Sequence, residues 1–193
     1  LVKKIINAID KVEEEMILGL VKSAPDKLRK LDCGNVVVRA QKKEGKVALV
    51  SGGGSGHEPA HGGYVGEGML DAAVAGAVFT SPTPDQIYEA IKAVATDAGV
   101  LCIVKNYTGD IMNFEMAVDM AKDEDIKADY VIVNDDVAVK DSLYTTGRRG
   151  VAGTVLVHKI AGALAETGAS LEEVKAVAEK VIANVRTMGM AIT

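Results

Sequence analysis

Residues 46–63 read KVALVSGGGSGHEPAHGG, an apolar run that passes directly into glycines and serines and then into two histidines. The first part, KVALVSGG, is expected to form a strand that ends in the glycine run. A glycine-rich segment after a strand can bring backbone amides close to a ligand, because glycine has no side chain in the way. The stretch therefore predicts a strand that leads into a ligand-binding loop.

Strands and helices alternate along the rest of the chain. Further strands are expected at NVVVRA, MLDAAVAGAVF, GVLCIVK and ADYVIV, which begin at residues 35, 69, 99 and 128. Helices are expected over the first 22 residues and over 81–95, 111–124, 151–166 and 170–185. This alternation predicts a three-layer α/β/α domain with a mainly parallel sheet.

Three of the predicted strands end in loops that are rich in chemically useful side chains. These loops are SGGGSGH (51–57), KNYTGD (105–110) and NDDVAVKD (134–141). In open α/β sheets, ligands bind in the crevice beyond the carboxyl ends of the strands. We therefore expect the three loops to meet at one edge of the sheet and to form a site there.

The pattern from His57 to His61 also fits the zinc-protease motif H-E-x-x-H. That motif needs both histidines on one face of a helix. Pro59 favours a helix that starts only after His57, and Gly62 then ends it, so zinc is not expected. Neither the P-loop pattern nor the dinucleotide pattern fits the glycines. Two interpretations stay open: a small-molecule pocket with His57 as acid or base, or a mobile loop with a surface histidine.

Charged residues near the other strand ends have two interpretations each. Asp110 could act as an acid or base beside Lys105, or it could cap the helix that follows. The pair Asp135-Asp136 resembles a metal-binding acid pair, but a structural role after a strand is the more common one. The pair Arg148-Arg149 could bind phosphate or an acidic partner, or start a helix in solvent. By contrast, Met112, Met116 and Met120 are spaced four apart on one helix and are expected to face the core.

The overall charge and hydropathy restrict the class of partner. A formal net charge of −5 disfavours binding to nucleic acid or to an anionic membrane. The chain shows no signal-peptide pattern and no apolar run near about 18 residues. Cys33 and Cys102 lack metal-site spacing, and Cys102 is expected to fill a buried strand. We therefore expect a cytoplasmic protein that contacts neither nucleic acid nor membrane.

Four strings in the chain together resemble the dihydroxyacetone kinase family, in the part that forms its substrate-binding subunit, DhaK. They are KVALVSGGGSGHEPAHGGYVGEGML, FTSPTPDQI, GVLCIVKNYTGDIMNFE and VNDDVAVKDSLYTTGRRGVAGTVL. They run through most of residues 46–156, which makes the resemblance far more specific than a glycine run. It implies a DhaK/DegV-like first domain and a homodimeric phosphotransferase subunit that binds dihydroxyacetone (glycerone) and presents an alcohol group for phosphorylation.

The resemblance also implies roles for individual positions. The expected substrate-binding residues are Gly54, Ser55, Gly56, His57, Lys105 and Asp110. Among them, amides of the glycine loop hold the substrate, and Lys105 contacts it. His57 and Asp110 are the expected catalytic hydrogen-bonding and acid/base groups near its hydroxyls. No metal ligand is implied in this chain.

The family also holds the ketone covalently on a histidine that lies in a Gly-His-Gly context in a second domain. None of His57, His61 and His158 has that context, and the chain ends at MGMAIT, where the family would continue. Residues 1–193 are therefore expected to form only the N-terminal α/β domain. No residue of this chain is therefore expected to form the covalent bond to the ketone. This piece alone is expected to be inactive.

The resemblance places the phosphoryl donor outside this chain. ADP or ATP with magnesium is expected on a nucleotide-binding DhaL-type subunit, recharged by a DhaM-type protein of the phosphotransferase system, or on a fused nucleotide-binding domain. An alternative function stays open, because the family includes paralogues that sense dihydroxyacetone and act as transcriptional coactivators. Those paralogues share the pocket, so residues 51–110 do not distinguish the two functions.

Overall fold

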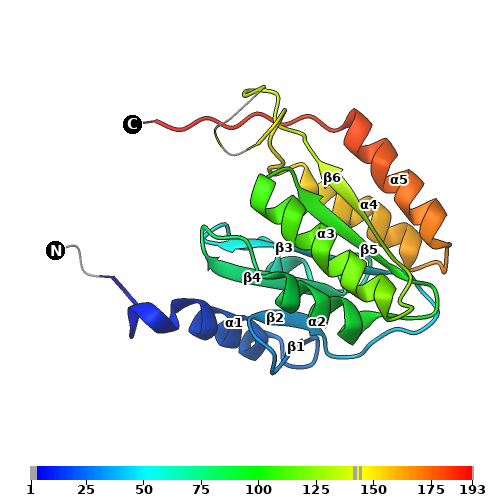
Figure 1. The fold of residues 1–193 in the computed structure, drawn as a ribbon. Coiled ribbons are helices and arrows are strands. Elements are labelled where there is room, and N and C mark those ends of the chain that lie inside the picture. Colours follow the sequence, from blue (N-terminus) through cyan, green and yellow to red (C-terminus); the bar gives the residue numbers. More distant parts are fainter. Residues whose placement is uncertain (1–3, 141–142, 144, 193) are drawn as a thin grey trace.

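One six-stranded sheet forms the centre of the structure, a computed structural model that describes residues 4–140, 143 and 145–192. Its strands are β1 (Leu28–Lys30), β2 (Val36–Arg39), β3 (Ala48–Ser55), β4 (Ala72–Val78), β5 (Val100–Lys105) and β6 (Ala128–Val133). They lie in the order β1-β2-β4-β3-β5-β6 (Figure 1). The four strands β4, β3, β5 and β6 are parallel to one another. Strand β2 pairs antiparallel with both of its neighbours, β4 and β1. The predicted mainly parallel sheet is confirmed.

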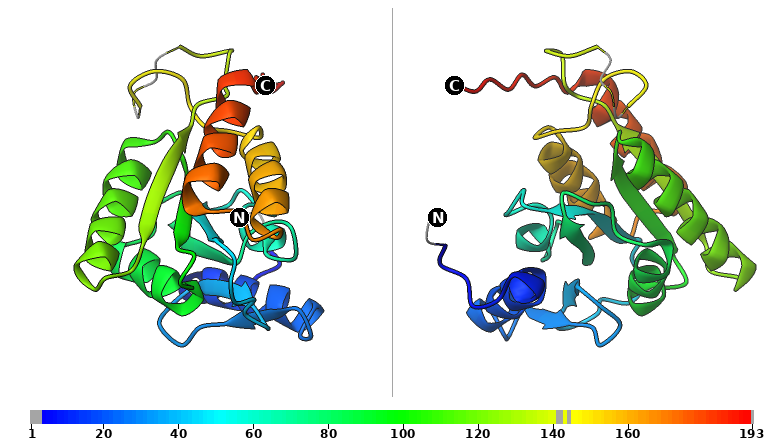
Figure 2. Two further views of the ribbon diagram at one scale, coloured as in Figure 1. Left: turned by 90° about the vertical axis from the view of Figure 1, so that its right-hand side faces the viewer. Right: turned by 60° about the vertical axis from the view of Figure 1, so that its left-hand side comes forward.

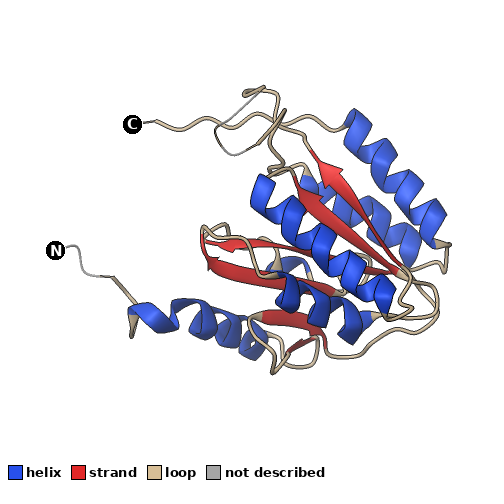
Figure 3. Ribbon diagram, viewed as in Figure 1, coloured by secondary structure: helices blue, strands red, loops and turns tan. Residues whose placement is uncertain are grey.

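Helices cover both faces of this sheet. They are α1 (Val12–Ser23), α2 (Pro84–Val94), α3 (Thr108–Asp123), α4 (Thr154–Ala165) and α5 (Leu171–Asn184), with short 3-10 turns η1 (Ile9–Lys11) and η2 (Gly62–Tyr64). Helices α2 and α3 lie on one face, and α4 and α5 lie on the other, which Figure 2 shows with the sheet between them. Figure 3 shows the parallel arrows of the sheet ending at a common edge. The predicted three-layer α/β/α fold is confirmed.

Alternation of side chains across β3 explains why both faces need cover. Val50 packs into the apolar cluster under α2 and α3, whereas Leu49 packs into the cluster under α4 and α5. A strand that is buried on both faces reads as a continuous apolar run, as KVALV does. The helix starts are fixed by capping boxes, in which Thr83 pairs with Gln86 ahead of α2, and Ser170 with Glu173 ahead of α5.

Two local predictions were wrong. The first helix was expected to span the first 22 residues, but α1 begins only at Val12 after a 3-10 turn, and Ile5 is fully exposed. The methionines of α3 were expected in the core, but Met112 and Met116 are 57% and 55% exposed, and only Met120 packs against the core, partly buried. The buried face of α3 is formed instead by Phe114, Ala117, Val118 and Ala121. Their spacing of three and four is that of a helix stripe against a sheet.

The chain order places a crevice at the carboxyl end of β3. The chain leaves the carboxyl end of β3 towards β4 on one side, and it leaves the carboxyl end of the adjacent β5 through α3 towards β6 on the other side. A crevice stays open between these two strand ends, because their connections leave in opposite directions. The glycine-rich segment therefore ends at the point in the sheet that is best suited to bind a ligand. In the described part of the chain, every helix is too short or too polar to cross a membrane.

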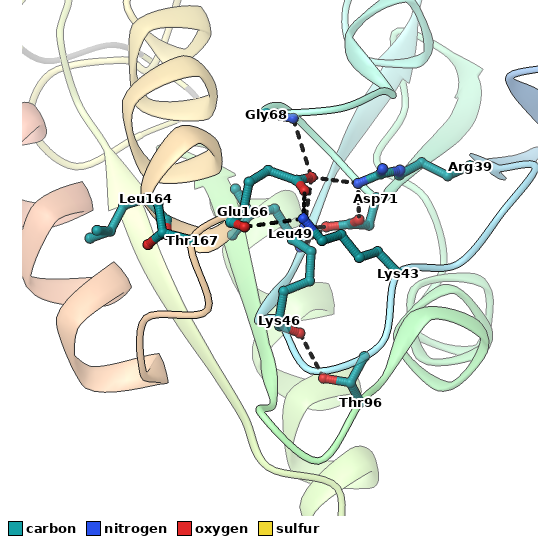
Figure 4. A network of polar contacts seen from close by, with 10 residues as sticks. All are labelled: Arg39, Lys43, Lys46, Leu49, Gly68, Asp71, Thr96, Leu164, Glu166 and Thr167. Atoms are coloured by element: carbon teal, nitrogen blue, oxygen red, sulfur yellow. Dashed lines mark hydrogen bonds and ion pairs between the residues drawn. The ribbon is translucent and has the colours of Figure 1, made fainter.

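A network of buried charges at the opposite end of β3 fastens α4 to the sheet (Figure 4). The ammonium of Lys46 is 1% exposed and donates to the Asp71 carboxylate at 2.5 Å. Glu166 accepts from Arg39 at 2.5 Å and from Lys43 at 2.8 Å. The hydrogen bonds from Lys43, Gly68 and Arg39 outweigh the effect of burial and lower the pKa of Glu166 to about 2. These charges can be buried because each has a partner of opposite sign.

We expect Lys46→Met to lower the free energy of unfolding by about 3 kcal/mol, because it leaves the Asp71 carboxylate buried without its nearest cation. Urea unfolding at neutral pH measures the effect. The matched control is Lys92→Met, which removes an exposed ion pair with Glu124. The control should leave the midpoint almost unchanged. Equal losses in the two variants would show that Lys46 contributes through nothing more than surface charge.

Candidate functional site

Four of the six expected substrate-binding residues meet in one cleft at the carboxyl edge of the sheet: Gly54, His57, Lys105 and Asp110. The cleft has a volume of about 770 Å³ and is lined by Gly54, His57, Phe79, Ser81, Lys105, Tyr107, Thr108, Gly109, Asp110 and Leu143. Gly54 comes from β3, Lys105 from the end of β5, and Asp110 from the first turn of α3. Loops 51–57 and 105–110 therefore lie at the same edge, as expected.

The glycine run is not a loop but the end of a strand, since β3 continues to Ser55. This corrects the expected boundary between strand and loop. A Cβ atom on Gly54 would lie 2.6 Å from the Thr80 amide nitrogen, so the backbone after β4 touches β3 here. A Cβ on Gly53 would lie 3.1 Å from Nζ of Lys105. The glycines therefore form a flat floor against which neighbouring groups can pack.

Two expected substrate-binding residues already have partners within the protein. The Ser55 hydroxyl is buried and donates to the Gly76 carbonyl at 2.7 Å. The Gly56 amide donates to both carboxylate oxygens of Glu58, at 3.0 and 3.2 Å. Neither residue lines the cleft. Ligand contacts by Ser55 and Gly56 stay predictions, and Gly56 would have to release Glu58 to donate to a ligand.

The buried Asp110 and the half-buried Lys105 carry opposite charges and lie near each other above the glycine floor. From a Cβ built on Gly53, Nζ of Lys105 is 3.1 Å away and Oδ2 of Asp110 is 3.8 Å away. Burial raises the pKa of Asp110, and it lowers the pKa of Lys105. Each shift is opposed by the attraction between the two charges. The cleft thus holds an acid and a base whose proton affinities are moved towards neutral pH, as general acid/base chemistry requires.

The side chain of Asp110 does not cap its helix. Helix α3 begins at Thr108, and its N-cap residue Tyr107 makes no side-chain cap bond. Asp110 instead accepts a short hydrogen bond from the Ser81 hydroxyl, which follows β4. It is only 4% exposed. The structure therefore favours a role in the cleft over the capping role that the sequence left open.

His57 lies at the exposed rim of the cleft. Its ring meets the Phe79 ring edge to face, with centroids 5.3 Å apart. Phe79 is 72% exposed and has a φ angle of +53°, which is rare for a residue with a side chain. A Cβ on Gly56 would lie 2.7 Å from the Phe79 ring. The glycine at position 56 therefore gives Phe79 the space to pack beside His57.

Six residues that line the cleft were not among the expected site residues: Phe79, Ser81, Tyr107, Thr108, Gly109 and Leu143. Phe79 was taken as the end of the strand MLDAAVAGAVF, and Ser81 as the start of the helix that follows. The available signal was that both residues follow β4, a fourth strand ending at the same edge. Tyr107 lies within the predicted KNYTGD loop, and its ring is 5.7 Å from Nζ of Lys105. An aromatic face near an ammonium stabilises the positive charge.

The loop after β6 lies at this edge too, but its acids have structural partners. Asp135 accepts from the amides of Val151 and Gly153, each at 2.8 Å, and Asp136 pairs with Arg149 at 2.6 Å. Neither acid lines the cleft. The structural interpretation of Asp135-Asp136 is therefore confirmed. Arg149 is not at a helix start, because α4 begins only at Thr154. Asp141, at the end of the predicted loop, lies outside the described residues.

The two histidines of the H-E-x-x-H pattern point to different places. His57 is exposed at the cleft, whereas His61 is buried against His158 of α4. The short helix expected from Pro59 is also absent from this segment, where a 3-10 turn begins only at Gly62. Across the described ranges, no three His, Cys, Asp or Glu side chains come together as metal ligands.

Comparisons with known proteins agree with this geometry. Residues 18–193 match the Dak1 domain family. The chain is 66% identical over 191 residues to the protein of Listeria innocua named PTS-dependent dihydroxyacetone kinase 1, dihydroxyacetone-binding subunit DhaK. That alignment covers 99% of this chain and 58% of the relative. The chain thus spans less than two thirds of the length of this relative.

Solved structures share the fold. The dihydroxyacetone kinase from C. freundii, in complex with AMP-PNP and Mg²⁺, superimposes with a TM-score of 0.89 at 42% identity, over 95% of this chain and 34% of that one. A structure described as the dihydroxyacetone kinase operon co-activator Dha-DhaQ gives a TM-score of 0.80 at 42% identity, over 86% of this chain and 51% of that one. The family match extends over almost the whole sequence and includes every residue of the cleft. The chain belongs to the Dak1 domain family.

Proposed function

We propose that this chain is the dihydroxyacetone-binding part of a dihydroxyacetone kinase and presents the ketone for phosphorylation. The observation that carries the proposal is the pair Asp110 and Lys105, held over a glycine floor in a cleft. The chain that forms this cleft is 66% identical to a protein named as a dihydroxyacetone-binding subunit. A buried carboxylate and a half-buried ammonium in one cleft match a substrate that carries both hydroxyl groups and a carbonyl oxygen.

Each side chain in the cleft has a definite task in this proposal. The Asp110 carboxylate accepts the proton of the hydroxyl that attacks phosphorus, as the new oxygen–phosphorus bond forms. The Lys105 ammonium donates to a substrate oxygen. His57 at the rim holds a neighbouring oxygen and helps to orient the hydroxyl. The floor at Gly54 lets the substrate approach the backbone, and Ser81 fixes the carboxylate by its hydrogen bond.

The phosphoryl donor is proposed to come from outside this chain. A DhaL-type subunit or a fused domain would carry ADP or ATP with magnesium, and a DhaM-type phosphotransferase-system protein would recharge the former. The relative's name, PTS-dependent, supports the bacterial type, and AMP-PNP and Mg²⁺ in the C. freundii kinase support a nucleotide donor in the family. A homodimer is proposed from the resemblance alone.

The covalent attachment of the ketone is not assigned to this chain. We propose that residues 1–193 act as the N-terminal α/β domain and that a histidine of a second domain closes the pocket. The support is that His57, His61 and His158 all lack a Gly-His-Gly context. Of the three, His61 and His158 are buried beside each other and cannot reach a substrate in the cleft.

The test is to mix the full-length protein with a nucleotide-bearing subunit of the DhaL type and a phosphoryl donor, and to measure dihydroxyacetone phosphate. Product formation that depends on both proteins is the expected result. Titration calorimetry with dihydroxyacetone measures binding separately. Absence of binding by the full-length protein would overturn the proposal.

A second candidate function is a dihydroxyacetone sensor that acts as a transcriptional coactivator. It is favoured by the fold shared with the co-activator Dha-DhaQ at 42% identity. The same two measurements separate the candidates, because a sensor would bind the ketone but give no phosphorylated product with any donor subunit.

A further inference from the structure

The segment that carries His57 is a compact turn between β3 and η2. Its backbone bonds to itself: Ala60 donates to the His57 carbonyl at 3.1 Å, Gly63 to Pro59 at 2.9 Å, and Tyr64 to His61 at 2.9 Å. We call residues 56–64 the histidine segment. These bonds fix its shape, but they do not fix where it lies relative to the sheet. That position has to come from contacts with other elements.

On one side, the histidine segment is packed loosely. An apolar cavity of about 390 Å³ lies between part of the segment and Met16, Ile17 and Leu20 of α1. The two elements touch at Gly62, where an added Cβ would lie 2.7 Å from Cδ2 of Leu20. Cavities of this kind give few dispersion contacts and leave their walls room to move. The side that faces α1 is therefore a weak attachment.

On the other side, the segment meets α4 through two buried imidazole rings. His61 is 7% exposed and His158 is fully buried. Nδ1 of His61 lies 3.1 Å from Nε2 of His158, and the rings meet edge to face with centroids 5.2 Å apart. Within the described residues, the outer nitrogens, Nε2 of His61 and Nδ1 of His158, have no partner. The contact between the rings is therefore the only polar bond that either side chain makes to the described part of the protein.

This contact requires at least one ring to be neutral. An imidazole–imidazole hydrogen bond needs one N–H donor and one bare nitrogen acceptor, so a single protonated ring can still donate, whereas two protonated rings have no acceptor between them and repel each other. The titratable groups that act on the pair are Lys105 of β5 and His57, and the Tyr64 ring lies 6.1 Å from His158. None of the groups that shift their proton affinity is a carboxylate. Burial first, then these neighbours, lower the pKa of His61 well below 6.5 and that of His158 to about 3.

We propose that His61 and His158 are a positioning pair, which fastens the histidine segment to α4 and so holds His57 at the rim of the cleft. At acidic pH this attachment is released. The fastening stands on the contact geometry alone. Its consequence for turnover rests on the proposed function, because it acts through the placement of His57.

The pH dependence has a definite sign. A histidine whose pKa is lowered in the fastened state takes up a proton only when the segment is released. The fastening is complete above pH 6.5, and it weakens as the pH falls below that value. Each histidine that becomes protonated on release favours the released state by about tenfold per pH unit. Two histidines give a combined slope of about a hundredfold per pH unit.

Hydrogen exchange of the Leu70 amide tests the fastening, with protection factors corrected for the intrinsic pH dependence of exchange. This amide donates to the Tyr64 carbonyl at 3.0 Å and so joins the histidine segment to the chain beside β4. In the unaltered protein we expect protection to fall at least tenfold per pH unit below pH 6.5. His158→Leu should lower protection at pH 7.5. His158→Gln places a side-chain amide near the position of Nε2, so it should restore protection at pH 7.5 with a shallower dependence on pH. Val157→Ala is the matched control. It removes two buried methyl groups at the position next to His158 in the sequence and should leave the pH slope unchanged.

A second measurement holds even if the leucine variant does not fold. In the ¹⁵N-labelled unaltered protein at pH 7.5, we expect a scalar coupling between Nδ1 of His61 and Nε2 of His158 across the hydrogen bond. Bare nitrogens on both facing sides, or protection of the Leu70 amide that is flat from pH 7.5 to 5, would overturn the proposal. Neither readout involves the ketone, so a failure here is distinct from a failure of the proposed function.

Discussion

Asp110→Asn is expected to lower the turnover of dihydroxyacetone phosphorylation by about 10²-fold or more, the usual scale for loss of a general base. An amide cannot accept the proton of the attacking hydroxyl. Burial raises the pKa of this carboxyl, so its proton affinity is better matched to neutral pH than that of an exposed aspartate. The near-isosteric amide keeps the shape of the side chain and can still accept a hydrogen bond from Ser81.

The same substitution should leave the protein at least as stable at pH 7. A carboxyl whose pKa is raised on folding binds its proton more tightly in the folded state, so its charged form costs stability as the pH rises through that pKa. Replacing it with a neutral amide removes this cost. Thermal unfolding measured beside turnover therefore separates the two roles of Asp110, because loss of a helix cap would lower the unfolding temperature.

Asp119→Asn is the matched control for both measurements, since Asp119 is exposed on the same helix. It should change neither turnover nor unfolding temperature. Unchanged turnover in Asp110→Asn would show that the catalytic role of Asp110 is wrong. A lower unfolding temperature in Asp110→Asn than in the control would show that its main role is structural.

The sequence could predict the site's location because that location depends on short-range signals. KVALV, GVLCIVK and ADYVIV are apolar runs that read as strands, and parallel strands end at a common edge. Lys105 and Gly54 follow from this, since each lies at a strand's carboxyl end. Asp110 follows as well, because it lies only five residues after Lys105 along the chain.

Contacts between distant segments could not be predicted in this way. Ser81 and Asp110 are 29 residues apart, and nothing in either segment indicates that they meet. The network around Lys46 joins segments up to 127 residues apart, as in the pair Arg39 and Glu166. A charged residue reads as exposed unless its partner is known.

Periodicity predicts a helix more reliably than it predicts the buried face. The spacing of Met112 and Met116 correctly places them on one face of α3. The face that packs against the sheet is the stripe around Phe114 and Val118, which is also apolar. Both stripes are consistent with a core, and only the position of the sheet decides between them. The predicted start of the first helix was wrong for a related reason. Ile5 fits the helical spacing of the apolar residues, but in the described structure it has no surface to pack against.

Lys105→Met is expected to weaken dihydroxyacetone binding by about tenfold or more, because hydrogen bonds from a charged donor contribute about 1.5–3 kcal/mol. It should also move the acidic limb of the pH–turnover profile to higher pH. Asp110 must be ionised to act as a base, and burial already raises its pKa. Lys105 and the Ser81 hydroxyl are the main groups that oppose this rise by stabilising the carboxylate. Without the ammonium, the carboxyl stays protonated to a higher pH, and turnover is lost earlier as the pH falls.

Two comparisons separate this effect from a general loss of structure. Ser81→Ala removes the other group that stabilises the carboxylate, so it should move the limb in the same direction while the ammonium stays in place. Lys122→Met, exposed at the end of the same helix as Asp110, should leave both the limb and the affinity unchanged. A limb that stays in place in Lys105→Met would show that Lys105 and Asp110 do not act on each other. A limb that moves to lower pH would show that Asp110 is not the group whose ionisation limits turnover.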